Sequence, residues 1–302
     1  MICPACGGEA TAWLRAPGSE PGDASSYELV RCPACGTAAT GGAGPGPTAY
    51  TSGVYSADRP RLRHLVDVVL RLATRLPLRA LRRAGVEPDA AVLDVGAGRG
   101  RLVAALREGG YRAEGIDPWP RGPGVAQASV GEHRAEGLDA VVLWHVLEHV
   151  ADPLATLERV RGWLRPGGVV LVATPNIESL QARIAGSTWF HLDVPRHRTH
   201  LTPRGLDELF ARARLEPVRT YHLVPEHNFH GMWFALLSRL GMRAGFPFHL
   251  LKRNVPAHPR DLALLLLAGP LLLLPALVLE LVAAAVRRGG TVVVVGRVQA
   301  PA

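Results

Sequence analysis

The sequence predicts an α/β fold with a largely parallel sheet, and three observations carry this prediction. The stretch Ala91 to Leu102, AVLDVGAGRGRL, has four apolar residues around Asp94, then alternating glycines, then the start of a helical pattern. Further short strand patterns end at Asp117 and Leu143. An N-capped amphipathic helix over Asp152 to Leu164 leads, through a glycine-containing stop, into another apolar strand. Strands that alternate with helices in this order indicate βαβ units.

The glycine turn after the first of these strands is typical of a nucleotide-like ligand. Its glycines are Gly96, Gly98 and Gly100. They allow unusual backbone angles and a close approach of the ligand to the main chain. A dinucleotide fingerprint needs a third glycine where Arg101 stands, and Asp94 would repel a pyrophosphate. An acid there suits a ligand with a cationic end, such as S-adenosylmethionine (SAM). Asp117, about 20 residues further on, can accept both ribose hydroxyls.

Around these residues the sequence resembles the class I SAM-dependent methyltransferases, and three later segments extend the resemblance. DAVVLWHVLEHVADP at Asp139 to Pro153 is similar to the fourth-strand segment of the small-molecule branch, and LRPGGVVLVATPN at Leu164 to Asn176 is similar to its fifth strand. WFHLDVPRHRTHLTPRGLDELFARARLEPV, from Trp189 to Val218, resembles the next segment of a quinone-methyltransferase-like subfamily. The resemblance covers about residues 60 to 224 and a last strand near 291 to 298. It implies a Rossmann-like sheet of seven strands.

The resemblance also implies which residues hold SAM. They are Asp94, Gly96, Ala97, Gly98, Gly100, Asp117, Pro118, Trp144 and His145. Trp144 and His145 fall where the family's chain passes the methionine moiety and the transferable methyl group. The alternative for His145 is a histidine satisfied by a backbone hydrogen bond. Glu148 and His149 brace the loop in this resemblance. The third strand, near Val125 to Ser129, is weakly patterned, so the residue that contacts adenine is not assigned.

A cluster of titratable residues in WFHLDVPRHRTH is the candidate catalytic group. Its members are His191, Asp193, His197 and His200. Methyl transfer from a sulfonium is an in-line displacement that needs alignment, and a base when the nucleophile is a hydroxyl. We predict His197 or His200 as this base and Asp193 as the residue that orients its ring. Two alternatives stay open: the cluster binds a divalent metal that polarises a catechol or enediol, or it is a structural turn in which Thr202 caps the next helix.

The cysteines form two matched CPACG motifs near the N-terminus. They are Cys3, Cys6, Cys32 and Cys35. Each motif places two thiolates on one tight turn, and two such turns complete a tetrahedral Zn²⁺ site. Disulfides are the alternative, but a cytoplasmic chain without an unpaired cysteine favours metal. Four thiolates leave no open coordination position, so we expect a structural zinc. The motifs resemble the small zinc module ahead of some sugar and natural-product methyltransferases.

The chain divides into five predicted parts. They are a zinc-binding module at 1–40, a linker at 41–60, a methyltransferase core at 61–224, an apolar helical insert at 225–290, and a last strand with tail at 291–302. The linker contains GGAGPGP, which has too little apolar content to fold. A helical pattern from Arg61 to Leu76 follows, and in the resemblance such a helix lids the cofactor. Tyr50 and Tyr55 either line the substrate entrance or pack the linker.

The insert separates two strands that the resemblance would join by a short hairpin, predicted at Val218 to Val224 and Thr291 to Val298. It contains LALLLLAGPLLLLPALVL, an uncharged run at Leu262 to Leu279 that is long enough to cross a bilayer. Strands of one sheet flank the run, so a single crossing is excluded, and Pro270 and Pro275 interrupt it. Monotopic contact with an anionic membrane is one interpretation, and a buried helical pair that covers the substrate site or forms a dimer interface is the other.

Composition restricts the partners only weakly. The 302 residues carry a formal net charge of +8, almost entirely from arginine, and Lys252 is the one lysine. Anionic lipids, phosphorylated substrates and nucleic acid all suit this charge. The start of the sequence lacks a basic segment followed by an apolar run, so we expect a cytoplasmic protein.

The sequence therefore predicts a SAM-dependent methyltransferase for a small-molecule, lipid or glycan acceptor, methylated at a hydroxyl. RNA methylation and sugar C-methylation are the competing activities. Against RNA, the fourth strand is followed by L-W-H-V instead of an N/D-P-P-Y/F motif, and aromatic stacking residues are few. A membrane-associated SAM-binding partner protein without turnover is the non-enzyme alternative. The oligomeric state is not predicted.

Overall fold

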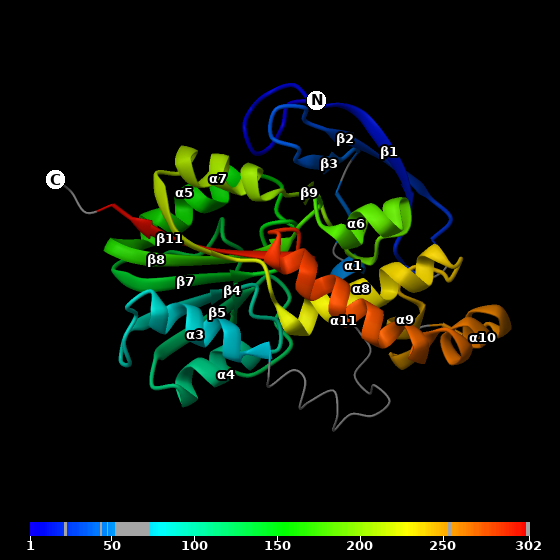
Figure 1. The fold of residues 1–302 in the computed structure, drawn as a ribbon. Coiled ribbons are helices and arrows are strands. Elements are labelled where there is room, and N and C mark those ends of the chain that lie inside the picture. The colour runs from blue at the N-terminus through cyan, green and yellow to red at the C-terminus, as the bar shows by residue number, and fades with distance from the viewer. Residues whose placement is uncertain (21–22, 43, 47, 52–72, 253–254, 300–302) are drawn as a thin grey trace.

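The computed structural model describes residues 1–20, 23–42, 44–46, 48–51, 73–252 and 255–299. Seven strands form its central sheet, in the order β10–β11–β8–β7–β4–β5–β6 (Figure 1). Their bounds are β4 Ala91–Val95, β5 Arg112–Asp117, β6 Val125–Gln127, β7 Leu138–Trp144, β8 Leu164–Pro175, β10 Leu215–Tyr221 and β11 Thr291–Val298. The five strands from β6 to β8 pair in parallel, and β11 runs antiparallel to both neighbours. The predicted seven-stranded α/β sheet is confirmed.

Helices cover both faces of this sheet (Figure 1). One face carries α3 (Arg75–Arg83) and α4 (Arg101–Glu108), and the other carries α5 (Pro153–Trp163) and α7 (Pro203–Arg212). Side chains along each strand alternate between the two faces. In β7, Val141 and Leu143 therefore pack with α5 and α7, whereas Ala140 and Val142 pack with α3 and α4. Both faces of the sheet are apolar, as the sequence pattern of parallel strands requires.

Local signals placed most helix starts correctly. Asp152 caps α5 by accepting a hydrogen bond from the Ala155 N–H at 3.0 Å, and Thr202 caps α7 by accepting one from the Gly205 N–H at 2.8 Å. Helix α5 ends at Trp163, directly before the predicted stop at Arg165 to Gly168. The strand starts earlier than predicted, because these four residues lie inside β8, where the register with β7 shifts. Most of the predicted helix from Arg61 to Leu76, together with Tyr55, lies outside the described residues.

The N-terminal module packs directly on the core. Its strands β1 (Thr11–Pro17), β2 (Ser26–Arg31) and β3 (Ala38–Thr40) form an antiparallel sheet that is completed by β9 (Thr199–His200), a strand from the core segment. The Thr202 hydroxyl also donates a hydrogen bond to the Cys35 carbonyl at 2.7 Å. Module and core therefore share one sheet, and a short helix, α1 (Thr48–Thr51), follows.

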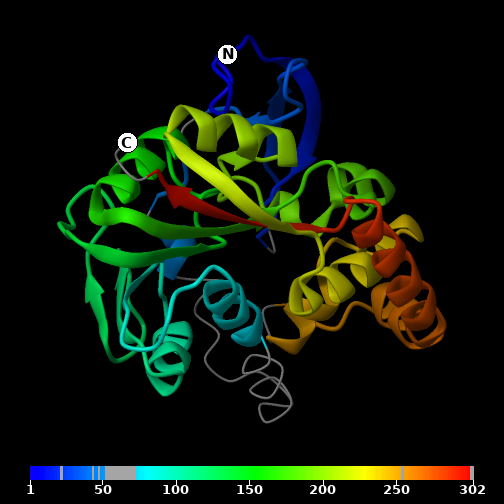
Figure 2. The ribbon, with the colours of Figure 1, turned by 60° about the vertical axis from the view of Figure 1, so that its left-hand side comes forward.

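The insert is helical and lies at one end of the sheet (Figure 2). Its helices are α8 (Pro225–Arg239), α9 (Phe246–Leu251), α10 (Pro259–Leu267) and α11 (Gly269–Ala285), and α6 (Leu180–Ala185) packs against α8. Two short 3-10 turns, Gly186–Thr188 and Phe190–Leu192, follow α6. In the described part of the chain, no single helix has the length and apolar composition needed to cross a membrane. The pair α10 and α11 meets both criteria together but is bent by 62°.

Candidate active site

The glycine loop follows β4, which lies between β5 and β7 at the point where the strand order reverses. Ligands of open α/β sheets bind at the carboxyl ends of strands at such a point. Gly96, Gly98 and Gly100 have φ values of 72°, 52° and 71°. A Cβ atom on Gly96 would lie 2.5 Å from the Val146 side chain, so only glycine fits there. A Cβ atom on Gly98 would meet no atom closer than 4.0 Å, so the backbone is open to a ligand at that position.

Asp117 ends β5 beside this loop. Its Oδ2 accepts a hydrogen bond from the Gly98 N–H at 2.9 Å, and its Oδ1 accepts one from the Trp119 N–H at 2.7 Å. These bonds fix the carboxylate, and each oxygen keeps a further acceptor site. Asp117 is only partly buried, so a ribose diol can reach it. The structure therefore brings Asp117 and the glycine loop together as predicted.

Asp94 lies on β4 with its carboxyl buried under the loop. Burial, and then the negative charge of Asp117, raise the pKa of this carboxyl to about 8. A cationic ligand would stabilise the ionised form of the Asp94 carboxyl. This environment fits the ammonium and sulfonium charges of SAM better than it fits a phosphate.

A cavity of about 1280 Å³ lies beside the loop. Its walls come from the β1–β2 connection, the segment after α6, and α8 and α9. Residues facing it include Ser19, Glu20, His145, His149, His191, Asp193, Arg196, His197, His227, His230, Trp233, Phe234, Phe246, Phe248, His249 and Lys252. Most of this lining is apolar or aromatic, with histidines set into it. The insert and the N-terminal module both contribute to the wall, as the sequence alternative of an insert covering the substrate site requires.

Two observations connect the cavity to the glycine loop. Val146, directly after the cavity residue His145, packs on Gly96. Lys252, at the end of α9, has its pKa lowered to about 8 by burial and by the positive charges of residues at the loop, Arg121 first, then Arg99 and Arg101. The cavity therefore opens next to the place where the cofactor would bind.

The predicted base candidates have different surroundings. The Nδ1–H of His197 donates a hydrogen bond to the His191 carbonyl at 2.9 Å, which leaves Nε2 as the basic atom. His197 faces the cavity. His200 instead lies in β9, where its Nε2 is 2.9 Å from the Thr40 hydroxyl, and burial lowers the pKa of its ring to about 3. Only His197 of these two is brought to the cavity.

Asp193 faces the cavity, but it does not orient the ring of His197 as predicted. Its Oδ2 lies 3.7 Å from the Nε2 of His197, which is beyond hydrogen-bond distance. Arg196 and the Ser19 hydroxyl bind the carboxylate instead, the latter at 2.8 Å, and the Arg196 charge helps to hold the Asp193 pKa well below its usual range against the effect of burial. Arg196 also pairs with Glu20 from the N-terminal module. The carbonyl of His191 does the orienting that the sequence assigned to Asp193.

His145 has a feature that the sequence did not indicate. Its Nδ1 lies 3.0 Å from Glu148 Oε1, while its buried Nε2 has no partner among the described residues. Burial alone would raise the Glu148 pKa, but the bond and the charge of His145 bring it to about 2, so Glu148 stays ionised. His227 packs on the His145 ring with centroids 4.2 Å apart. Glu148 thus orients a histidine at the edge of the cavity.

The cavity histidines of the insert were missed by sequence reasoning. His227, His230 and His249 come from α8 and α9, far from the motifs. The signal that could have indicated them is histidine interleaved with Trp233 and Phe234 in a helix ahead of the apolar run. The ring of Tyr50 stacks on the ring of Trp119, with centroids 4.8 Å apart, close to the glycine loop.

The predicted four-residue metal cluster is not the group that the geometry brings together. Glu148, His149 and His197 each offer one ligand atom, all within 4.8 Å of one another. His191 and Asp193 are not part of this set, and His200 is bonded to Thr40. A divalent ion is therefore compatible with a trio that shares only His197 with the four predicted residues.

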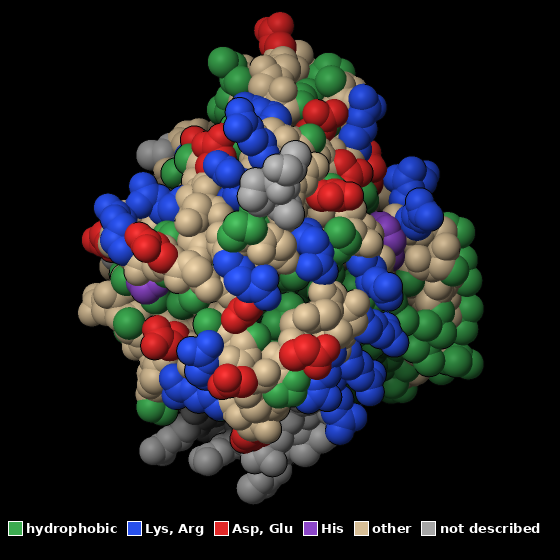
Figure 3. Space-filling model, turned by 90° about the vertical axis from the view of Figure 1, so that its left-hand side faces the viewer, with side chains coloured by type: hydrophobic (Ala, Val, Ile, Leu, Met, Phe, Trp, Pro, Cys, Tyr) green, Lys and Arg blue, Asp and Glu red, His purple; other side chains and the backbone are tan. Residues whose placement is uncertain are grey.

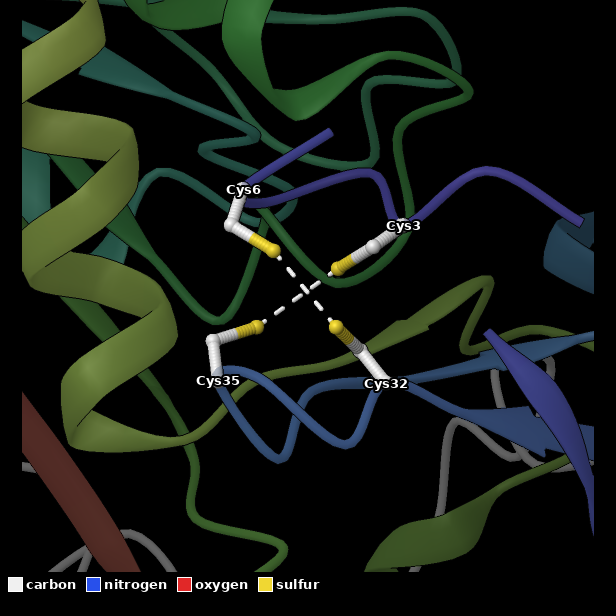
Figure 4. Close-up of side chains that lie close together, drawn as sticks. All are labelled: Cys3, Cys6, Cys32 and Cys35. Carbon is white, nitrogen blue, oxygen red and sulfur yellow. Dashed lines mark hydrogen bonds between the residues drawn. The ribbon is translucent and has the colours of Figure 1, made fainter. Parts of the chain in front are cut away.

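The four cysteines converge from the two CPACG turns (Figure 4). The Sγ atoms of Cys3 and Cys35 are 3.5 Å apart, as are those of Cys6 and Cys32, and all four lie within 4.8 Å of one another. Zinc–sulfur bonds of about 2.3 Å place tetrahedral thiolates at such separations. The donor set and its spacing fit Zn²⁺.

This fold, with a glycine loop and two acids at the carboxyl edge of the sheet, defines the methyltransferase class. A family model described as a methyltransferase domain matches residues 58–220, more than half of the sequence. The chain therefore belongs to the methyltransferase domain family, and the class I assignment made from the motifs is confirmed.

Individual relatives agree with this family. The chain is 31% identical over 170 residues to a ubiquinone biosynthesis O-methyltransferase of Cereibacter sphaeroides (strain ATCC 17029 / ATH 2.4.9), covering 49% of this chain and 65% of that protein. It is 30% identical over 200 residues to the protein of the same name from Methylobacterium sp. (strain 4-46), covering 58% and 77%. The chain thus spans slightly less than two thirds of the first relative.

Solved structures that resemble the fold include a 1,6-didemethyltoxoflavin-N1-methyltransferase from Burkholderia thailandensis, which contains S-adenosylhomocysteine. Its sequence identity is 18% and its TM-score 0.46, and the match covers 87% of this chain and 96% of that one. A SAM-dependent methyltransferase from Archaeoglobus fulgidus has 17% identity and a TM-score of 0.45, covering 74% and 94%.

Proposed function

We propose that this chain uses SAM to methylate a hydroxyl of a small amphiphilic acceptor, of a lipid or glycan type. The observation that carries the proposal is the large, mostly apolar cavity beside the glycine loop, with histidines in its wall. Pockets of this kind bury most of a small ligand, and a few polar groups orient it. The relatives named ubiquinone biosynthesis O-methyltransferase support oxygen as the methylated atom.

SAM supplies an electrophilic methyl group, and the residues around it have separate tasks. Asp94 compensates the cofactor's positive charge, the glycine loop admits it, and Asp117 binds its ribose. His197, with Nδ1 held by the His191 carbonyl, accepts the acceptor's hydroxyl proton at Nε2. The apolar and aromatic side chains of the wall would bury the acceptor and present its hydroxyl oxygen as the nucleophile.

A metal-assisted route is the second candidate for the same reaction. The trio Glu148, His149 and His197 supports it, because their ligand atoms lie within 4.8 Å of one another. A divalent ion there would polarise the acceptor oxygen and lower the pKa of the hydroxyl. Turnover that survives dialysis against a chelator of Mg²⁺ and Mn²⁺ supports the base route. Loss of turnover at unchanged zinc content, restored by added Mg²⁺ or Mn²⁺, supports the metal route.

We also propose that the four cysteines hold a structural Zn²⁺. The support is the chemistry of the donors, four sulfurs at tetrahedral spacing on two tight turns. With all four positions filled by thiolates, the ion would have no site for substrate.

The test of the acceptor class is transfer of label from methyl-labelled SAM into separate pools. The pools are a total-lipid extract, a soluble nucleotide-sugar fraction and RNA, each with the wild-type protein and with Asp117→Ala. We expect label in the lipid fraction with the wild type alone. Label in RNA or in the nucleotide-sugar fraction instead would overturn the proposed acceptor. SAM binding without transfer to any pool would support the non-enzyme alternative.

A further inference from the structure

The insert carries an exposed apolar surface, which we call the apolar face. Ten large apolar residues on α10, α11 and the residue after it form the apolar face: Leu266, Leu267, Leu271, Leu273, Leu274, Leu277, Val278, Leu281, Val282 and Val286. They make up most of the exposed large hydrophobic residues in the described part of the chain, and Leu267 and Leu271 are 74% and 75% exposed. A continuous hydrophobic block stands at the right-hand edge of Figure 3, on the side of the insert helices in Figure 2. Contiguous apolar surface of this kind marks an interaction site.

The other side of α11 is fixed to the core by buried polar groups. Glu280 accepts hydrogen bonds from Gln181 Nε2 at 2.8 Å and from the Gly290 N–H at 2.9 Å. At the opposite end, the Trp233 indole donates to the Gly269 carbonyl at 2.9 Å, where α10 meets α11. One end of α11 is therefore tied to α6 and to the residue before β11, and the other end is tied to α8, so the apolar face is a consequence of the fold itself.

The charge around the apolar face is positive. Arg260 lies exposed at the start of α10. Arg287 and Arg288 lie exposed at the end of α11, where Arg288 is 3.9 Å from the Glu178 carboxylate. The acids Asp261 and Glu280 of these two helices are both buried, and Asp261 is paired with Arg243. Between residues 259 and 288, all of which are described, the exposed charges are thus basic only.

We propose that the apolar face docks this protein on an anionic lipid bilayer, with α10 and α11 lying in the interface and the arginines meeting headgroup phosphates. Helices of this type bind through buried apolar area together with electrostatic attraction. A second copy of the chain fits less well. A two-fold interface would place the same surface on both partners, so the basic residues around each apolar face would come close to those of the other.

The docked face lies next to the cavity. Trp233 both lines the cavity and bonds to the α10–α11 junction. Val255 belongs to the cavity wall and packs in one cluster with Leu264 and Leu265 of α10. If the proposed function holds, a lipid-like acceptor would have a short path from the bilayer to the histidines, and docking itself is measurable without turnover.

The test is flotation of the full chain with vesicles of phosphatidylcholine alone or with phosphatidylglycerol added, at low and high salt. The variant is Leu271→Glu with Leu274→Glu, and the matched control is Val218→Glu, an exposed apolar residue on β10 that is 44% exposed. We expect the wild type and the control to float with the anionic vesicles, and several-fold less at high salt. The partition coefficient of the double variant onto anionic vesicles should be at least about tenfold lower, because two apolar side chains no longer enter the interface.

Three results would overturn the proposal. They are equal flotation of the double variant, binding of the wild type that does not depend on phosphatidylglycerol, and a stable wild-type dimer without lipid that the double variant converts to monomer. Circular dichroism and SAM affinity of the double variant verify that it is folded. If docking holds while no lipid accepts a methyl group, the proposed acceptor fails and the docking surface stands.

Discussion

At the residue scale, His197 and His200 occupy different chemical environments although three positions separate them. His197 faces the cavity, and His200 is bonded to Thr40 in the shared sheet. We predict that His197→Gln lowers kcat by about 10²–10⁴-fold with little change in SAM affinity, since it removes a base and no cofactor contact. His200→Gln should keep turnover within a few-fold and lower the melting temperature.

Single-turnover rates and SAM titrations of both variants check this prediction, with His145→Gln measured in parallel. If His145→Gln abolishes turnover and His197→Gln does not, the base belongs to the His145–Glu148 pair. A collapse of SAM affinity in His197→Gln would contradict a purely acceptor-side role.

Asp94 gives a prediction about pH. In the cofactor-free protein its raised pKa, about 8, keeps the carboxyl largely protonated at pH 7. A cationic ligand favours the carboxylate, so SAM binding should release up to about one proton at pH 6–7, and affinity should rise with pH until about 8. Calorimetry in buffers of different ionisation enthalpy measures the release. Asp94→Asn should bind more weakly and release none, and proton uptake by the wild type would contradict the assignment.

The same raised pKa has a consequence for folding. The folded state binds a proton that the unfolded chain loses near pH 4, so the free energy of unfolding falls as pH rises from about 4 to about 8. SAM should reduce this fall because it stabilises the ionised form. Melting curves with and without SAM at pH 5 and pH 8 measure both effects, with Asp94→Asn expected to flatten the pH dependence.

At the element scale, the pairing of β3 with β9 connects the cysteine site to the cavity. Thr40, at the end of β3, donates a hydrogen bond to the His197 carbonyl at 2.7 Å. We predict that removing zinc, by chelation or by Cys32→Ser, lowers the melting temperature by several degrees and reduces turnover, because β3 no longer supports that segment. Elemental analysis should find about one Zn²⁺ per chain.

The matched control for the zinc prediction is Arg15→Ala, an exposed change on β1 of the same module. It should keep zinc, stability and turnover. If the zinc-free protein melts at the same temperature and turns over normally, the module does not support the cavity.

Helix α11 depends on its one buried acid. Glu280→Ala would leave Gln181 Nε2 and the Gly290 N–H without their acceptor, at a cost of about 1–3 kcal/mol for each buried group. We therefore expect a loss of about 2–6 kcal/mol in the free energy of unfolding, measured by denaturant titration. Leu277→Ala, an exposed residue of the same helix, should change it by less than about 0.5 kcal/mol. Equal losses in the two variants would show that the buried bonds are not what holds the helix.

At the scale of the whole molecule, the sequence predicted what short-range signals encode. The predicted bounds of the strand Thr291–Val298 agree with the observed ones, because a valine run follows a glycine pair. The strand before it was predicted at Val218 to Val224 and lies at Leu215–Tyr221, because its register is set by pairing with β11, some 75 residues later in the chain. A local pattern contains no information about that pairing.

The same distinction applies to the site. The glycine loop and Asp117 were predictable because one motif and one strand end define them. The cavity was not, since Glu20, His145 and His249 reach it from three separate parts of the chain, the N-terminal module, the core and the insert. Asp193 was assigned to His197 by proximity in sequence, but Arg196, with a full positive charge, competes for it more strongly.

The position of β11 has a consequence for synthesis on the ribosome. In the chain it follows the other strands of its sheet, yet it lies between β8 and β10. Until residues 291–298 have emerged, β10 has no partner in the sheet, and the Gly290 N–H that binds Glu280 is not yet held in place. The leucine-rich helices are therefore translated before the sheet that anchors them can close. A nascent chain at this stage would expose α10 and α11, its most apolar segment. Chaperones or a lipid surface could therefore bind these helices before folding is complete.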